Sequence, residues 1–255
     1  MRMTQAQIEP MIRFEDEAVL VVHKPPFLAV ETKNPRQQDL VSLLKNRSAM
    51  HAAAPYVGLV HRLDQPVEGL LVLAKTPGAA RTLSAGLAGG GFTKEYLAVV
   101  HGVMPETGTL VHTLKKDGRR NCSRVVCAGM PGGKEARLSY ERLAVKDEKS
   151  LLLIRLDTGR HHQIRVQLAA SGHPLCGDEK YGARAAEIKG SVRLVADGIQ
   201  KIPPALCSFC LAFVHPKRGV RMEFCEKPAG AGFSLFSGEI ESWIAEYREN
   251  NSNII

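Results

Sequence analysis

The sequence predicts a single α+β domain built on a mixed, mostly antiparallel β-sheet flanked by helices and loops. Short runs of β-branched and aromatic residues recur at hairpin distances in the second half of the chain, between turns rich in Gly, Lys and Asp. Segments with helical spacing are few and short. The 255 residues, 44% of them hydrophobic, suffice for a substantial core, and no repeat or long polar linker divides them. We expect one domain over 10–248 and a loose tail over 249–255.

The N-terminal part of the chain alternates strand and helix patterns. Residues 14–22 (FEDEAVLVV) predict a turn and a short strand, which ends at Pro25-Pro26 because proline cannot donate to a strand ladder. The spacing of apolar residues further predicts a short helix within 36–47, a strand buried on both faces over 69–75, and a helix over 79–87.

From Lys94 onward, strand patterns dominate. Residues 162–171 predict a helix that Gly172 and Pro174 stop, and residues 242–248 predict a terminal helix. The predicted strands of this region cover residues 96–101, 109–114, 136–145, 150–156, 205–214 and 220–225.

Charge and terminal sequence limit the classes of partner and compartment. The 34 Lys and Arg against 26 Asp and Glu leave a net charge of +8, which favours a polyanionic partner without by itself specifying nucleic acid. The sequence has no apolar run of ~18 residues, and its start lacks the apolar centre of a signal peptide. We therefore expect a soluble cytoplasmic protein.

Six thinly spread cysteines suit reduced thiols better than a disulfide scaffold. Cys207 and Cys210 form a lone C-x-x-C, and together with Cys122 and Cys127 they offer four thiolates for zinc. The first pair is spaced by four residues, however, and the second lies in an apolar segment. We therefore expect buried reduced cysteines in a strand.

The segment His61-Arg62-Leu63-Asp64 places a carboxylate beside two basic side chains, in a turn that leads into the buried strand at 69–75. The backbone holds an Asp at such a junction, and nearby cations keep it ionised. Asp64 is therefore a candidate nucleophile or general base.

A second polar segment, residues 159–168 (GRHHQIRVQL), opens the predicted helix at 162–171. Arg165 lies on the helix face away from Ile164 and Leu168, so it can point inward only if a carboxylate meets it. We pair it with Asp64 as a hypothesis. The alternative is a surface salt bridge.

The loop 115–120 (KKDGRR) between two predicted strands concentrates basic residues. A solvated hairpin tip is the favoured interpretation, and contact with phosphate is the alternative.

Several motifs together resemble, in the same order, those of the RluA family of RNA pseudouridine synthases, and the likeness spans nearly the whole chain. Ordered motifs of this kind are far more specific than any one of them. They are VVHKPP at 21–26, HRLD at 61–64, GLLVLAKT at 69–76, KEYLAVVHG at 94–102, GRHHQIRV at 159–166, GHPL at 172–175, GD at 177–178, YG at 181–182 and HP at 215–216.

The resemblance implies a pseudouridine synthase fold and an isomerase that converts specific uridines of RNA to pseudouridine. The bond from N1 to C1′ breaks, the base turns over, and C5 joins C1′. Asp64 matches the family's catalytic aspartate, Tyr96 the tyrosine that lies against the uracil, and Arg165 the arginine that pairs with the aspartate. Arg62 matches the arginine that fills the gap left by the flipped uridine, and the alternative for it is a salt bridge to Asp64 or Glu68. We also expect a group of polar residues to bind substrate: His61, Lys94, Arg160, His162 and Gln163.

The chain departs from the family pattern at several positions. Val67-Glu68-Gly69 replaces the usual Thr-Ser-Gly, which adds a carboxylate that would repel phosphate unless Arg62 or Lys94 screens it. His161 replaces a usual threonine, and Cys207 to Cys210 stand where a His-containing segment is common. The sequence shows no N-terminal S4 RNA-binding domain, which weakens the case for a large-subunit target and leaves tRNA or a short stem-loop open.

We expect the chain to act as a monomer on RNA, either rRNA or tRNA, without DNA, membrane, metal or organic cofactor. One alternative is an RNA-binding or RNA-folding protein that keeps the scaffold without turnover. The retained Asp64, Tyr96 and Arg165 argue against it, because binding alone needs no carboxylate that faces a polyanion. Another is a glycoside or nucleoside hydrolase, which normally needs two carboxylates, and only Glu68 is near Asp64 in sequence.

Overall fold

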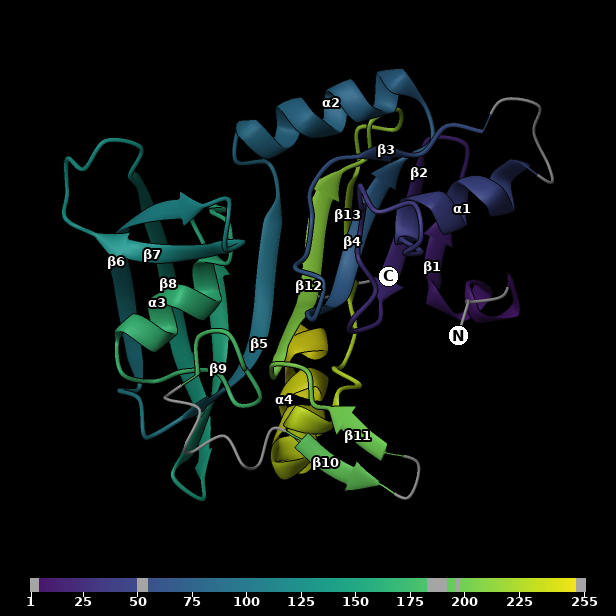
Figure 1. The fold of residues 1–255 in the computed structure, drawn as a ribbon. Coiled ribbons are helices and arrows are strands. Elements are labelled where there is room, and N and C mark those ends of the chain that lie inside the picture. The colour runs from purple at the N-terminus through teal and green to yellow at the C-terminus, as the bar shows by residue number, and fades with distance from the viewer. Residues whose placement is uncertain (1–4, 50–54, 183–191, 196–197, 251–255) are drawn as a thin grey trace. The chain divides into compact units, whose positions relative to one another are not determined.

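Strand residues outnumber helical residues in the structure, a computed structural model that describes residues 5–49, 55–182, 192–195 and 198–250 (Figure 1). The chain forms two units, each assembled from separate stretches of sequence. The first unit takes in residues up to Lys94, then Cys207–Pro228, then residues from Glu246. The second takes in Glu95–Leu206 and Ala229–Ala245.

The first unit is a mixed sheet in the order β1-β2-β4-β12-β13, with the short β3 pairing the end of β4. The pairing of β4 with β12 is parallel and the other pairings are antiparallel. The strands are β1 (Ile12–Glu15), β2 (Val19–Lys24), β3 (Gly58–Leu59), β4 (Glu68–Ala74), β12 (Leu206–Val214) and β13 (Arg221–Cys225).

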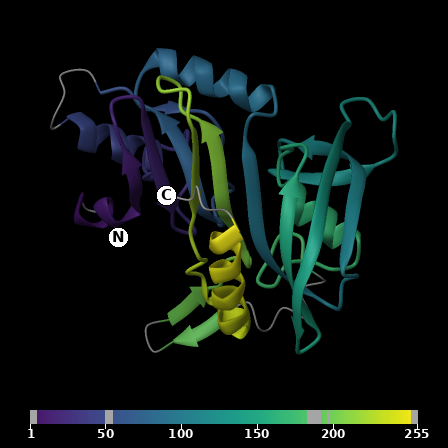
Figure 2. The same ribbon diagram turned by 180° about the vertical axis from the view of Figure 1, so that it is seen from behind.

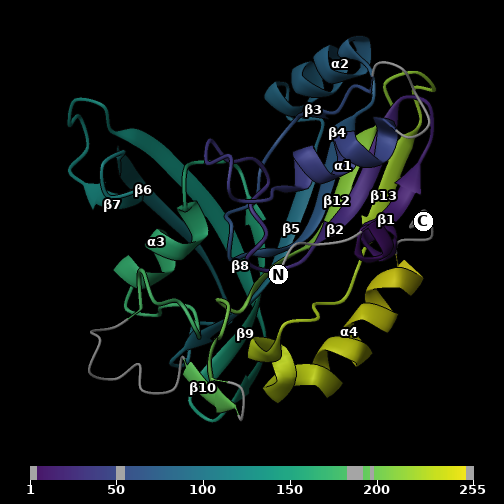
Figure 3. The same cartoon turned by 45° about the vertical axis from the view of Figure 1, so that its right-hand side comes forward.

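Two helices accompany this sheet, α1 (Leu40–Ala49) and α2 (Pro77–Ala88) (Figure 3). Thr76 caps α2, since its hydroxyl accepts a hydrogen bond from the amide of Ala79 at 3.1 Å. Ala79 and Leu83 of α2 pack against buried apolar residues of β2, β4, β12 and β13. Every residue of β2 and β4 is buried, which explains their continuous apolar runs. Two short 3-10 turns, Gln5–Gln7 and Glu9–Met11, precede β1.

The second unit is an antiparallel sheet in the order β5-β9-β8-β6-β7. Helix α3 (Gln163–Ala170) lies against one face, in front of the sheet in Figure 1 and behind it in Figure 2. Gln167 of α3 donates to the carbonyls of Leu110 and Ala136, which ties the helix to two strands. The strands are β5 (Thr93–His101), β6 (Thr107–Asp117), β7 (Cys122–Val126), β8 (Lys134–Lys146) and β9 (Lys149–Leu156).

A separate hairpin, β10 (Val192–Val195) with β11 (Gly198–Lys201), also belongs to the second unit. The 3-10 helix η4 (Ala231–Phe236) leads into α4 (Ser237–Asn250), whose last residues, from Glu246 onward, fall in the first unit.

The predicted α+β class with a mixed, mostly antiparallel sheet is confirmed. Strands β1, β3, β7, β10 and β11 were not predicted, and α4 begins five residues before the expected Ser242. Glu249 and Asn250 end α4 rather than starting the expected loose tail, and residues 251–255 of that tail lie outside the described residues. The single-domain bounds 10–248 stay a prediction.

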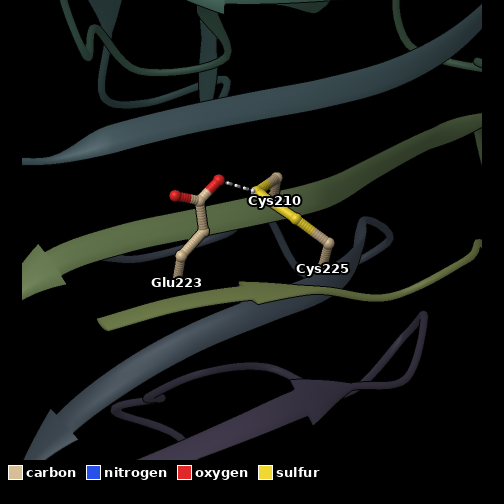
Figure 4. Close-up of side chains that lie close together, drawn as sticks. All are labelled: Cys210, Glu223 and Cys225. Carbon is tan, nitrogen blue, oxygen red and sulfur yellow. Dashed lines mark hydrogen bonds between the residues drawn. A yellow bond between two sulfur atoms is a disulfide. The ribbon is translucent and has the colours of Figure 1, made fainter. Parts of the chain in front are cut away.

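The expectation that all six cysteines are reduced is wrong for one pair. Cys210 and Cys225 face each other across β12 and β13 and form a disulfide (Figure 4). The sequence hides this pairing because 15 residues separate the two cysteines and only the hairpin register brings them together. The other four cysteines are free thiols.

Candidate active site

Asp64 lies in a tight turn that leads into β4. The turn is closed by the amide of Val67, which donates to the carbonyl of Asp64 at 3.0 Å. Leu63 and Val67 on either side are buried, whereas Arg62 is exposed and Asp64 is half-buried. The two apolar neighbours anchor the turn in the core, so the carboxylate is held at the boundary between core and solvent.

The backbone at the start of β4 lies very close to the backbone of β12. A Cβ atom on Gly69 would lie 2.4 Å from the amide nitrogen of Ser208, and Gly69 has a φ of +124°. Both the close approach and the backbone angle therefore require glycine. The Ser208 hydroxyl donates to the Leu70 carbonyl at 3.2 Å, which adds a second link between the strands five or six residues after Asp64.

Lys24 at the end of β2 is fully buried beside the Asp64 turn. Its ammonium donates to three carbonyls, those of Pro25, Leu28 and Gln65, at 2.9, 2.8 and 3.1 Å. Gln65 follows Asp64 directly, so Lys24 fixes the backbone of the Asp64 turn. Burial lowers the pKa of Lys24 to about 7, although the charges of Asp64 and Glu68 oppose that shift.

The repulsion expected between Glu68 and RNA phosphate, unless Arg62 or Lys94 screens it, stays a prediction. Glu68 is only 3% exposed. Its position opposite Cys207 in the parallel pairing of β4 and β12 turns it into the core. Burial, together with the charges of Glu68 and Glu226, raises the pKa of the Cys207 thiol well above its usual value, so Cys207 is not a nucleophile here.

His61 makes structural contacts. Its Nε2 accepts a hydrogen bond from the amide of Val72 at 3.3 Å, and its ring meets the edge of Phe92 at 6.1 Å between centroids. Desolvation, with a smaller contribution from the charge of Lys94, lowers the pKa of His61 to about 3, so the imidazole is neutral. Burial also lowers the pKa of Lys94. Their contact with substrate stays a prediction.

In the second unit, Tyr96 is buried on β5, opposite Ile154 of β9. Its neighbour Glu95 accepts a hydrogen bond from Arg155 Nε at 2.6 Å across the same pair of strands. The backbone ladder of β5 and β9 sets the position of Tyr96, and this ion pair adds to it.

Arg165 is buried on α3 and forms a two-pronged ion pair with Asp178, both N–O distances being 2.7 Å. Its guanidinium also lies over the Tyr181 ring, 5.2 Å from the centroid. The sequence predicted a carboxylate partner but named Asp64 and missed Asp178, which stands in the GD motif at 177–178. Asp64 and Arg165 belong to different units, so their pairing stays a prediction.

A ring of polar contacts surrounds the start of α3. His162 adopts a left-handed backbone with φ of 55°, and its Nδ1 lies 2.8 Å from the Tyr181 hydroxyl. That hydroxyl accepts the amide of Ser123, whose own hydroxyl lies 3.0 Å from Nδ1 of His161. The rings of His161 and His162 stack at 3.8 Å. His161, where the family has threonine, thus ties β7 to α3.

Gln163 and Arg160 are also held by the protein itself. The Gln163 side chain accepts from the Thr158 hydroxyl and the Arg160 amide and donates to the Arg137 carbonyl. Arg160 is exposed, and its Nε donates to the Glu135 carbonyl at 2.8 Å. Gln163 therefore shapes the turn before α3, and substrate binding by either residue stays a prediction.

The first half of the basic segment 115–120 is the end of β6, and its second half enters the tip of the hairpin between β6 and β7, so the expected hairpin tip is shorter than predicted. Asp117 turns the chain by accepting the amides of Arg119 and Arg120 at 3.0 and 3.1 Å. Both arginines are exposed. Among the described residues, no carboxylate lies within ion-pair distance of either guanidinium.

The predicted site residues thus fall into two groups. His61, Arg62, Asp64 and Lys94 belong to the first unit, and Tyr96, Arg160, His162, Gln163 and Arg165 to the second. Lys24 was missed as a site residue, although a lysine closing an apolar strand before two prolines is a usable signal. Within the described part of the chain, one group of possible metal ligands stands close together, namely Cys210, Glu223 and Cys225.

Comparison with known proteins assigns these residues to a family. Residues 18–170 match the family described as RNA pseudouridylate synthase. The ribosomal large subunit pseudouridine synthase D of Vibrio cholerae is 35% identical over 223 residues, covering 86% of this chain and 68% of that protein. The enzyme of the same name from Escherichia coli O6:H1 is 36% identical, covering 86% and 69%.

Solved structures agree on the fold. Human RNA pseudouridylate synthase domain containing 4 superposes with a TM-score of 0.70 at 22% identity, covering 92% of this chain and 94% of that one.

In the described segments, every helix is too short or too polar to cross a bilayer. The matched family spans the Asp64 turn, Tyr96 and Arg165, and the chain is a pseudouridine synthase of the RNA pseudouridylate synthase family.

Proposed function

We propose that Asp64 is the reacting group in the conversion of an RNA uridine to pseudouridine. The observation that carries this proposal is the anchoring of its turn, with Leu63 and Val67 buried and Lys24 bonded to the Gln65 carbonyl. A carboxylate fixed in this way meets the substrate without first having to become ordered. The reaction is a redox-neutral isomerisation, in which one bond from C1′ is exchanged for another.

Two further side chains act on the same uridine in this proposal. Tyr96 offers a flat ring with a hydroxyl, which can stack on the uracil and relay a proton. Arg165 keeps the reacting carboxylate ionised, and the Asp178 ion pair holds its guanidinium in place. A guanidinium has five N–H donors, more than the two that Asp178 takes, so one arginine can serve two carboxylates.

Arg62 is the proposed wedge that fills the gap left by the flipped uridine. It is exposed two residues before Asp64, on the solvent side of the anchored turn. A planar cation suits this task because it stacks on bases and donates hydrogen bonds at the same time.

Ribosomal RNA is the proposed substrate. The relatives at 35–36% identity carry the large ribosomal subunit in their names, which favours rRNA over the tRNA that the sequence left open. An enzyme that modifies rRNA works where ribosomes are made, so we propose the cytoplasm as its compartment. The monomeric state stays part of this proposal.

Asp64→Asn tests the proposal. We expect the variant to fold and to bind RNA but to lose at least about 10³-fold in activity, because the amide is neither a nucleophile nor a base at neutral pH. Unmodified rRNA and tRNA would be incubated with each protein, and carbodiimide-dependent reverse-transcription stops would be mapped. Asp147→Asn, in an exposed turn with φ of 47°, is the matched control and should keep full activity.

Each other outcome of this assay argues against a part of the proposal. Stops that persist with Asp64→Asn would remove Asp64 from the chemistry. Free uracil would indicate a hydrolase, and RNA binding without stops or uracil would indicate an RNA-folding protein. Stops in tRNA alone would overturn the rRNA assignment.

A further inference from the structure

Cys210 and Cys225 occupy directly opposed positions at the end of the β12–β13 ladder. Their Cα atoms are 4.3 Å apart, and Cys225 is the last residue of β13. Both side chains are buried. The backbone register therefore holds the two sulfur atoms together whether or not they are bonded, so the pair can be opened and closed without moving either strand.

Glu223 lies on the same face, two residues before Cys225 (Figure 4). Its Oε1 atom is 3.6 Å from the Cys210 sulfur, and the carboxylate is only 8% exposed. Among the described residues, its one cationic neighbour is Arg221, at 3.7 Å from Oε2. A disulfide sulfur has no proton to donate, whereas a thiol does. The buried carboxylate is thus better satisfied when Cys210 is a thiol.

The C-terminal end of α4 covers the pair. The Tyr247 hydroxyl lies 3.8 Å from the Cys210 sulfur, and Arg248 donates to the Cys225 carbonyl at 3.0 Å. Tyr247 can donate to the sulfur in either redox state, so it does not counteract the preference set by Glu223.

We propose that Cys210 and Cys225 form a reversible redox modification site, with Glu223 as the residue that makes its disulfide easy to reduce. In the oxidising direction, one thiolate attacks a small-molecule disulfide and releases one thiolate from it. The second cysteine then attacks the mixed disulfide and releases the other. The protein loses two electrons and two protons, and the small disulfide becomes two thiols.

The thiols of Cys176 and Cys207 do not compete for this role. Burial raises the pKa of Cys176 to about 11 and that of Cys207 well above its usual value, so both stay protonated. Neither has another cysteine opposite it in the strand registers of the described residues.

Counting thiols tests the pair itself. The full chain would be equilibrated in mixtures of reduced and oxidised dithiothreitol, quenched in acid, unfolded and labelled with a maleimide. We expect six labels per chain in the reducing limit and four in the oxidising limit, with peptide mapping to residues 210 and 225. Cys225→Ser should give five labels in both limits. Six labels in every mixture, or a disulfide between other cysteines, would overturn the proposal.

Glu223→Gln tests the role of the carboxylate. The midpoint ratio of reduced to oxidised dithiothreitol should rise about tenfold, since a charge-assisted hydrogen bond that favours the thiol is lost. Glu17→Gln is the control, because Glu17 is exposed and forms a similarly long ion pair, 3.6 Å to Lys217, elsewhere in the same unit.

An unchanged midpoint, or one that moves the other way, would remove Glu223 from the site. Zn²⁺ added to the reduced protein provides a separate check. Uptake of one equivalent that depends on both cysteines and on Glu223 would instead indicate a metal site and would overturn the redox assignment.

Discussion

Buried charge decides the geometry around Asp64 at the scale of single residues. Lys24 carries its ammonium into the core, where three carbonyls take all three of its protons, and Glu68 carries a carboxylate into the same region. Such groups cost free energy to bury, so a well-packed apolar residue would be the more stable choice in general. The hydrogen bond from Lys24 to the Gln65 carbonyl indicates that this buried lysine sets the position of the Asp64 turn.

Lys24→Met should destabilise the protein by about 3 kcal/mol or more. The methionine fills most of the volume but leaves the carbonyls of Pro25, Leu28 and Gln65 without their donor, at about 1–3 kcal/mol for each buried group left unpaired. Urea unfolding followed by circular dichroism measures the change. Lys33→Met, at an exposed position, is the control. A loss below about 1 kcal/mol for Lys24→Met would show that water replaces the ammonium.

The difference in stability between wild type and Lys24→Met should also depend on pH. The pKa of Lys24 is about 7 in the folded protein and 10.5 in the unfolded chain, so the unfolded chain binds more protons between these values. The free energy of unfolding contributed by this group therefore rises with pH across the window from 7 to 10.5, by at most about 1.4 kcal/mol per pH unit, and is flat below it. We expect the difference in stability between wild type and Lys24→Met to widen from pH 7 to 9. Parallel profiles would contradict the shifted pKa.

Patterns in the sequence predicted the candidate catalytic residues but not the residues that hold them in place. Asp64 could be found because an acid between basic residues and an apolar strand is a local signal. The Asp178 partner of Arg165 could not be chosen from spacing, because Asp178 follows 13 positions later, beyond a turn, and several carboxylates compete. The burial of Glu68 depends on the parallel neighbour β12, which joins β4 from 138 residues away.

At the scale of elements, the close contact between β4 and β12 fixes the start of β4, just after the Asp64 turn. Gly69→Ala should destabilise the protein by more than about 3 kcal/mol, because a Cβ atom would overlap the Ser208 backbone as well as strain a φ of +124°. Gly90→Ala is the matched control, since Gly90 has φ of +78° but nothing within 4 Å of an added Cβ. It should cost only the strain, about 1 kcal/mol.

Thermal melts of the two variants decide the question. Equal losses would show that backbone strain alone explains the glycine, and that β12 gives way at Ser208. A larger loss for Gly69→Ala, together with a drop in activity, would tie the strand junction to the placement of Asp64.

Elements with a continuous or alternating apolar pattern were predictable within a few residues, as β2, β4 and α2 show. Strand β7 (CSRVV) was missed because it is short and polar, and its register comes from β6. Helix α4 begins earlier than predicted because Ile240 and Ile244 are buried, and their spacing of four residues was not recognised. The pairing of β7 and the start of α4 both depend on packing against segments that are distant in the sequence.

At the scale of the whole molecule, the sequence has a net charge of +8, but not every basic residue is open to a polyanion. Some basic side chains pair with carboxylates, and others do not. Two hairpin tips illustrate the difference. At the tip between β12 and β13, Lys217 and Arg218 face Glu17 and Asp16 at 3.6 and 3.0 Å. At the tip between β6 and β7, no carboxylate of the described residues pairs with Arg119 or Arg120. Only the second tip presents net positive charge that a phosphate backbone can use.

The double variant Arg119→Gln, Arg120→Gln should therefore weaken RNA binding without changing the chemical step. Each lost phosphate contact removes about 0.7 to 0.9 from the slope of log affinity against log salt concentration, so two contacts should lower that slope by up to about 1.8. Filter binding to an rRNA fragment at several salt concentrations measures the slope, and single-turnover assays at saturating enzyme measure the rate.

The double variant Lys217→Gln, Arg218→Gln is the control. Its slope should match that of the wild type because the cations that it removes are already neutralised. If both variants lower the slope equally, binding responds to net charge alone; if the first lowers the saturated rate as well, the β6–β7 tip takes part in positioning the uridine.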